Sequence, residues 1–148
     1  MLTLEINRNF KTNNIPPDVD LQRWAASAYR GDKKANACLI IVSEQQIKKY
    51  NNDYRKKNES TNVLSFPANL NIIDGDVFLG DIVACATIIE KEAKEQNKEL
   101  FSHWAHMMIH SILHLQNFDH NDDENARIME NIEIEILDSF NILNPYES

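Results

Sequence analysis

The alternation of apolar and polar residues along the chain predicts four strands and five helices. Strands are expected where apolar residues alternate with polar ones or run together briefly, at residues 2–6, 37–42, 61–67 and 77–85. The run at 37–42 is apolar without interruption, which is typical of a central strand covered on both faces. Helices are expected where apolar residues recur every three or four positions, at residues 16–30, 44–50, 87–96, 98–117 and 121–140. This interleaving favours an α/β (α+β) fold built on one small mixed sheet.

Residues that break regular structure mark the ends of several elements. Pro67 is expected to close the third strand, and turn residues from Asn69 to Asp76 separate it from the fourth. Gly80 lies within the fourth strand, where it permits a bulge or the close approach of another backbone. The stretch from Asn51 to Ser60 is polar and basic and is expected to form a loop.

The length of the chain suits one domain that spans residues 1–148. A chain of 148 residues buries about two-thirds of its unfolded surface, so it needs no disulfide. Its two cysteines, Cys38 and Cys85, lie in apolar runs and are interpreted as small buried side chains. No basic leader precedes an apolar block, and no apolar run reaches the roughly 18 residues of a membrane helix. We therefore expect a cytoplasmic protein that has no membrane partner.

The charge of the chain is acidic overall but unevenly distributed. A net charge of -8 argues against a general nucleic-acid binder, which would carry a basic surface. Acidic residues concentrate in the last thirty positions, whereas basic residues gather at Lys48, Lys49, Arg55, Lys56 and Lys57. A local basic segment can therefore still contact an anionic substrate.

A cluster of histidines carries the strongest chemical signal. All five histidines fall between His103 and His120. His110 and His114 are four residues apart and share one face of the predicted helix, about 6 Å apart along its axis. Asn117 is able to adopt the left-handed conformation that ends a helix, so His120 is expected to turn back toward the other two. The three histidines form a predicted site for one metal ion per chain.

His103 and His106 lie on the same helical face and complicate the choice of ligands. A set made of His106, His110 and His114 would span about 12 Å along a straight helix, whereas a metal-nitrogen bond is only about 2 Å long. A straight helix therefore supplies two ligands and not three. We expect His103 and His106 to orient a ligand, to contact substrate or to pack within the helix layer.

Three imidazoles around an open position are typical of catalytic zinc, since structural zinc usually has four protein ligands. Such an ion lowers the pKa of bound water to near 7 and polarises phosphoryl or carbonyl oxygens, which favours hydrolysis. The histidine spacing equals that of metzincin zinc peptidases, His-Glu-x-x-His-x-x-Gly-x-x-His. However, Ser111 occupies the position of the peptidase general base and Asn117 that of the glycine. A peptidase remains an alternative, as does a non-enzymatic module in which zinc only stabilises a surface that docks on the ribosome.

Several sequence blocks resemble the YbeY family of bacterial metal-dependent endoribonucleases. Residues 110–120 are similar to the family signature His-Gly-x-Leu-His-Leu-x-Gly-Tyr-Asp-His. Tyr54-Arg55 followed by Thr-Asn-Val-Leu-Ser-Phe-Pro at residues 61–67 also matches, as do Leu-Gly-Asp-Ile-Val at 79–83 and His-Trp-Ala-His at 103–106. The resemblance covers most of residues 45–140. The chain departs from the family pattern at Ser111 and Asn117, which replace glycines.

This resemblance implies a single catalytic domain with zinc held by His110, His114 and His120. It implies cleavage of single-stranded RNA, with no action on DNA, in maturation of the 3′ end of small-subunit ribosomal RNA and in ribosome quality control. Ribosomal RNA is the implied substrate, and the ribosome or ribosomal proteins are the implied partners. Arg55 matches the functionally important arginine of the family. A guanidinium near the metal would clamp a phosphate and stabilise the charge that builds on its oxygens.

Overall fold

The computed structural model describes residues 1–73 and 75–147, apart from the side chains of residues 69–73. Its strands are β1 (Leu2–Arg8), β2 (Ala35–Val42), β3 (Val63–Ile73) and β4 (Asp76–Cys85). Its helices are α1 (Asp18–Ala28), α2 (Glu44–Arg55), α3 (Ala86–Glu95), α4 (Leu100–Leu115) and α5 (Asp123–Ser139). The predicted α/β fold with one small mixed sheet is therefore confirmed. Within the described residues, no helix is both long and apolar enough to span a bilayer.

The four strands form one sheet in the order β1-β2-β4-β3. β1 and β4 both run parallel to β2, whereas β3 runs antiparallel to β4 and forms one edge of the sheet. The apolar strand β2 is central, as its uninterrupted run of apolar residues predicts. The parallel core and the antiparallel edge strand together make the sheet mixed.

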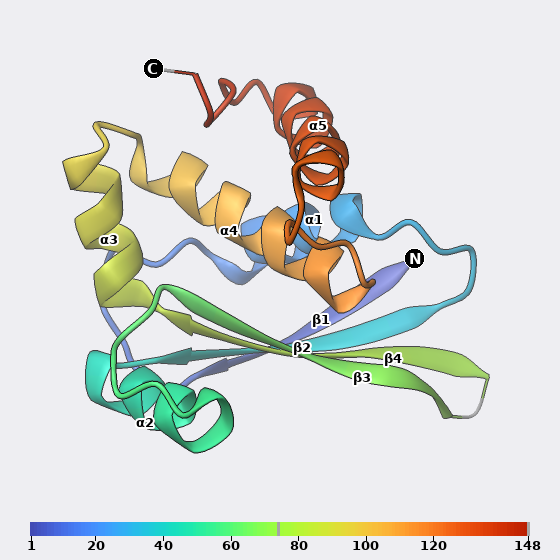
Figure 1. Ribbon diagram of the computed structural model, residues 1–148, viewed down its shortest axis with the longest axis horizontal. Coiled ribbons are helices and arrows are strands. Elements are labelled where there is room, and N and C mark those ends of the chain that lie inside the picture. Colours follow the sequence, from blue (N-terminus) through green and yellow to red (C-terminus); the bar gives the residue numbers. More distant parts are fainter. Residues whose placement is uncertain (74, 148) are drawn as a thin grey trace.

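Helices cover the sheet unequally on its two faces. α2 lies on one face, and α1, α3, α4 and α5 lie over the other (Figure 1). Side chains of β4 alternate between the two layers: Ile82 and Ala84 belong to the large core under α4, whereas Val83 joins Ile47 of α2 in the smaller core. β4 therefore contributes to two apolar layers, as the two-residue period of a strand requires.

The end of the third strand differs from the prediction. β3 does not stop at Pro67 but continues to Ile73, after a register shift between Pro67 and Asn71. An edge strand tolerates a proline because one side of its backbone has no partner strand. The predicted turn at residues 69–76 is therefore wrong for residues 69–73, which continue the strand, and Asp74 lies outside the described residues.

Gly80 of β4 lies opposite Pro67, next to the irregularity in β3. Its φ of +139° is a conformation that only glycine adopts readily. A Cβ atom at this position would collide with the backbone carbonyl of Phe66. The predicted close approach of a second backbone at Gly80 is confirmed.

The predicted loop from Asn51 to Ser60 is wrong in its first half, because α2 runs on to Arg55. Ser43 caps this helix in a reciprocal capping box with Gln46. Asn51 is buried, and its side-chain amide donates a hydrogen bond to the carbonyl of Glu59 at 2.9 Å. A polar residue thus belongs to the inner face of α2, which is why the sequence pattern underestimates the length of the helix.

Candidate metal centre

The C-terminal half of α4 places two histidines next to each other. His110 and His114 are one turn apart, and their Nε2 atoms are 3.1 Å apart. Most other residues of α4 are buried against the sheet and the neighbouring helices, so its histidine-bearing face has a fixed position. The predicted helical pair of histidines is therefore present.

His120 is brought back to this pair by the turn that ends α4. Asn117 has a left-handed φ of +73°, and its N–H donates to the carbonyl of His114. The N–H of Phe118 reaches back to the carbonyl of Leu113, as in a glycine-type helix end. The His120 ring centroid lies 5.5 Å from that of His110 and 5.0 Å from that of His114. The structure thus brings together the three histidines that the sequence singled out.

The donor atoms of the three histidines fit one metal ion. One ring nitrogen from each lies within 4.8 Å of the others. Two nitrogens bound to the same tetrahedral zinc at about 2.0–2.1 Å would be about 3.3 Å apart, close to the separation of 3.1 Å between His110 and His114. Burial, together with the nearby His110 and His120, lowers the pKa of His114 to about 4. His114 is therefore neutral at neutral pH, the form that binds metal.

Glu133 of α5 is a site residue that the sequence reasoning missed. Its carboxylate is fully buried, and Nδ1 of His110 donates to its Oε2 at 2.7 Å. Nε2 of His106 donates to the other oxygen at 2.8 Å, and the Tyr146 hydroxyl also donates to it. Burial alone would raise the pKa of Glu133, but the hydrogen bonds from His106 and His110 lower it to about 2. Glu133 is therefore ionised and holds His110 in the tautomer whose Nε2 lone pair faces His114 and His120.

His106, His110 and Glu133 also lie close enough together to be considered as a second ligand set. However, the contacts within this group are accounted for by hydrogen bonds, since each carboxylate oxygen already accepts an N–H. His103 similarly contacts Glu92, with Nε2 and Oε1 2.9 Å apart. His103 and His106 thus each contact a carboxylate, which agrees with the expectation that they orient a ligand or pack within the helix layer.

A signal for Glu133 was present in the sequence. It lies in the stripe of α5 that buries Met129, Ile136 and Leu137, where an apolar residue would be expected. A carboxylate at such a position requires a partner that satisfies its charge. The stripe alone, however, does not reveal that this partner is a histidine of α4.

The three histidines line a pocket of about 650 Å³ at the edge of the sheet. α2 contributes Tyr54 and Arg55, α4 contributes Met107, and residues 62–66 at the start of β3 form one wall. Arg55 is exposed and belongs to the same pocket as the histidines, but to the last turn of α2 and not to a loop. No carboxylate is among the described residues that line this pocket. The arrangement combines three histidines that could hold a metal ion with an exposed cation, and it is suited to an anionic group.

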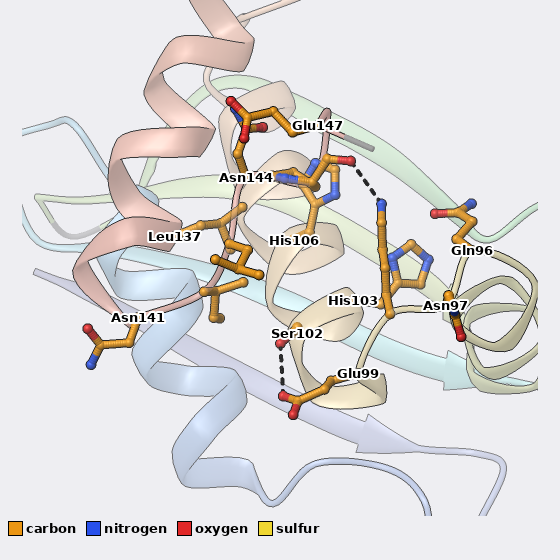
Figure 2. Close-up of a pocket in the computed structure, with 14 residues that line it drawn as sticks. Gln96, Asn97, Glu99, Ser102, His103, His106, Leu137, Asn141, Asn144 and Glu147 are labelled. Atoms are coloured by element: carbon orange, nitrogen blue, oxygen red, sulfur yellow. Dashed lines mark hydrogen bonds between the residues drawn. The ribbon is translucent and has the colours of Figure 1, made fainter.

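A second pocket, of about 550 Å³, lies toward the beginning of α4 (Figure 2). His103 and His106 form part of its wall beneath the C-terminal segment that carries Asn144 and Glu147. The amine of Lys98 donates to the carbonyl of Pro145 at 3.1 Å, which ties this segment to the loop before α4. This pocket contains neither Arg55 nor the three clustered histidines.

Comparison with known proteins identifies close relatives. The family profile described as Endoribonuclease YbeY matches residues 5–141. Proteins with the name Endoribonuclease YbeY include one from Buchnera aphidicola subsp. Acyrthosiphon pisum, 46% identical over 134 residues that cover 90% of this chain and 86% of the relative. Another from Chromobacterium violaceum is 40% identical and covers 98% of this chain and 86% of its own. The solution structure of a Thermotoga maritima protein superposes with a TM-score of 0.53 at 25% identity, covering 99% of this chain and 97% of that protein.

Proposed function

This chain belongs to the YbeY family of endoribonucleases, and from that premise we propose that it is a zinc-dependent endoribonuclease that cleaves single-stranded RNA. The reaction takes place in the pocket of about 650 Å³ between the ends of α2 and α4. One zinc ion per chain is held by His110, His114 and His120. Residues 1–148 act as a single catalytic domain.

One observation carries this proposal: Arg55 and the three histidines line the same pocket, and no carboxylate is among its described lining residues. A phosphodiester carries a negative charge that such a pocket accepts without repulsion. The overall charge of -8 therefore does not exclude RNA binding, because the acidic residues lie outside the described lining of this pocket.

Zinc, Glu133 and Arg55 have separate tasks in the proposed reaction. When bound by the three histidines, zinc would supply Lewis-acid polarisation of a phosphoryl oxygen and would lower the pKa of water. Glu133 accepts the Nδ1 proton of His110 and so fixes the ring that presents Nε2 to the site. The guanidinium of Arg55 contacts the non-bridging oxygens of the phosphate and stabilises the charge that builds on them.

The peptidase alternative lacks the carboxylate it requires. A zinc peptidase uses a glutamate beside the first histidine as general base, but Ser111 occupies that position and is fully buried. Glu133 does not replace it, because its oxygens already accept hydrogen bonds from His106, His110 and Tyr146. The alternative of a purely structural zinc is disfavoured by the open pocket next to the histidines.

The proposed biological role is maturation of the 3′ end of small-subunit ribosomal RNA, together with ribosome quality control in the cytoplasm. Ribosomal RNA is then the substrate, and the ribosome or its proteins are the partners that deliver it. The support for this finer proposal is the similarity of the chain to proteins named Endoribonuclease YbeY.

A substrate panel on one purified preparation tests the proposed activity. Single-stranded RNA, double-stranded RNA, single-stranded DNA and an unstructured peptide are each incubated with the protein, and its metal content is measured. We expect cleavage of single-stranded RNA alone. Cleavage of the peptide would favour the zinc peptidase, and a metal-loaded protein that cleaves none of the four would favour the non-enzymatic module.

A further inference from the structure

Tyr54, the residue before Arg55 on the last turn of α2, has an exposed aromatic ring. The residue is 66% exposed although it is large and hydrophobic. Single exposed apolar residues are normal on protein surfaces. Tyr54 differs from such a residue because it lines the same pocket as Arg55 and the three histidines.

The Tyr54 ring is held in place by two other aromatic rings. It makes an edge contact with Phe66 of β3, with ring centroids 5.2 Å apart and planes at 63°. It lies nearly parallel to Tyr50, one turn earlier on α2, with centroids 6.2 Å apart and planes at 19°. Edge and offset contacts of this kind are the favourable arrangements for aromatic pairs. The ring is thus fixed in orientation while much of its surface remains free.

A fixed and exposed aromatic ring next to a phosphate site matches the chemistry of an unpaired nucleobase. Proteins recognise single-stranded RNA by stacking its bases on aromatic side chains while basic residues follow the backbone. Tyr54 and Arg55 offer these two elements from adjacent positions, and both line one pocket. Since the ring is already positioned, stacking costs little ordering of the protein.

We propose that Tyr54 is a stacking site for an unpaired RNA base adjacent to the phosphate that Arg55 contacts. This inference rests on the proposed endoribonuclease function and adds a base subsite to it. A base in a duplex is stacked on its neighbours and paired, so it must be extruded before it reaches the ring. Tyr54 therefore contributes to the preference for single-stranded RNA, and it does so without selecting a base, because every base has an aromatic face.

The test compares Tyr54→Ala, which removes the ring, with Tyr54→Phe, which keeps it. Phe101→Ala serves as a matched control, because Phe101 is 43% exposed and is not among the residues that line this pocket. Short RNAs that carry one abasic residue at successive positions serve as substrates beside the intact RNA. On intact RNA we expect kcat/KM to fall about tenfold or more in Tyr54→Ala and to stay near wild type in the other two variants. With the abasic residue at the stacked position, wild type and Tyr54→Ala should become equal.

Stacking is also measured without cleavage, through the fluorescence of RNAs that contain a single 2-aminopurine. At one position we expect quenching by wild type and by Tyr54→Phe, but not by Tyr54→Ala. Equal quenching by wild type and Tyr54→Ala, or the same loss of kcat/KM on intact and abasic RNA, would overturn the stacking site. If wild type cleaves no RNA, the proposed function fails, while the quenching experiment still decides whether Tyr54 stacks on a base.

Discussion

Glu133 and His110 form a buried pair that links α5 to α4, with Oε2 of the carboxylate 2.7 Å from Nδ1 of the imidazole. The carboxylate is fully buried and the His110 side chain is 19% exposed. Because the Nδ1 proton is committed to Glu133, only Nε2 of His110 is available as a ligand. The orientation of His110, the first of the proposed metal ligands, is therefore set by a residue from a different helix.

Removal of this carboxylate should weaken metal binding. In Glu133→Gln the neutral amide is a poorer acceptor for the His110 proton, so we expect zinc affinity to fall about 10- to 100-fold. Competition with a chromophoric chelator measures this affinity. Glu135→Gln, at an exposed position on the same helix, should bind zinc like wild type. Equal zinc affinity in Glu133→Gln and Glu135→Gln would show that Glu133 does not contribute to zinc binding.

Arg55 provides a second prediction. Arg55→Lys keeps a positive charge at the end of α2 but loses the two-pronged geometry that matches a phosphate. We expect turnover of RNA to fall on the order of a hundredfold, by analogy with the loss of one oxyanion donor, while metal content and thermal stability stay unchanged. Arg127→Lys, an exposed position on α5, is the control. Wild-type turnover in Arg55→Lys would mean that the metal alone stabilises the charge that builds on the phosphate.

The salt dependence of RNA binding provides a third prediction. The exposed cation at the pocket is Arg55, with Lys56 and Lys57 directly after it, in a chain whose net charge is -8. RNA binding should therefore release few counterions. A plot of the logarithm of the RNA association constant against the logarithm of the salt concentration should have a slope of roughly −1.5 to −3, which corresponds to two to four phosphates. Filter binding at a series of salt concentrations measures the slope. A slope that indicates six or more phosphates would require a larger basic surface than Arg55, Lys56 and Lys57 provide.

Gly80 provides a prediction about the fold behind the site. Gly80→Ala places a Cβ against the carbonyl of Phe66 at a φ of +139°, so it should lower the free energy of unfolding by more than about 1 kcal/mol. Gly75→Asn is the comparison, because an added Cβ at Gly75 meets no atom within 4 Å and its φ is +85°. Urea denaturation should show the larger loss for Gly80→Ala. Equal losses in the two variants would mean that the contact with Phe66 carries no energy.

Local sequence rules predicted the elements and the histidine geometry of this chain. The spacing of His110 and His114, with Asn117 as the turn residue, was enough to place His120 beside them, because helix periodicity and a left-handed residue are local properties. The central position of β2 followed from its uninterrupted apolar run in the same way.

The features that escaped prediction depend on contacts between distant parts of the chain. β3 continues past Pro67 because an edge strand next to Gly80 accommodates the irregularity. α2 extends to Arg55 because Asn51 finds a partner in Glu59. Glu133 is paired with histidines on another helix, 23 and 27 residues earlier. Neither local propensity nor a two- or four-residue period carries information about such partners.

In the proposed function, the chain cleaves RNA with a metal held by His110, His114 and His120. The most direct test is the rate of single-stranded RNA cleavage by chelator-treated protein as zinc is added back. Wild type should be inactive without metal and should recover as zinc approaches one equivalent per chain, whereas His120→Ala should not recover at that stoichiometry. Full cleavage by the metal-free protein, or equal recovery of His120→Ala at one equivalent, would contradict the claim.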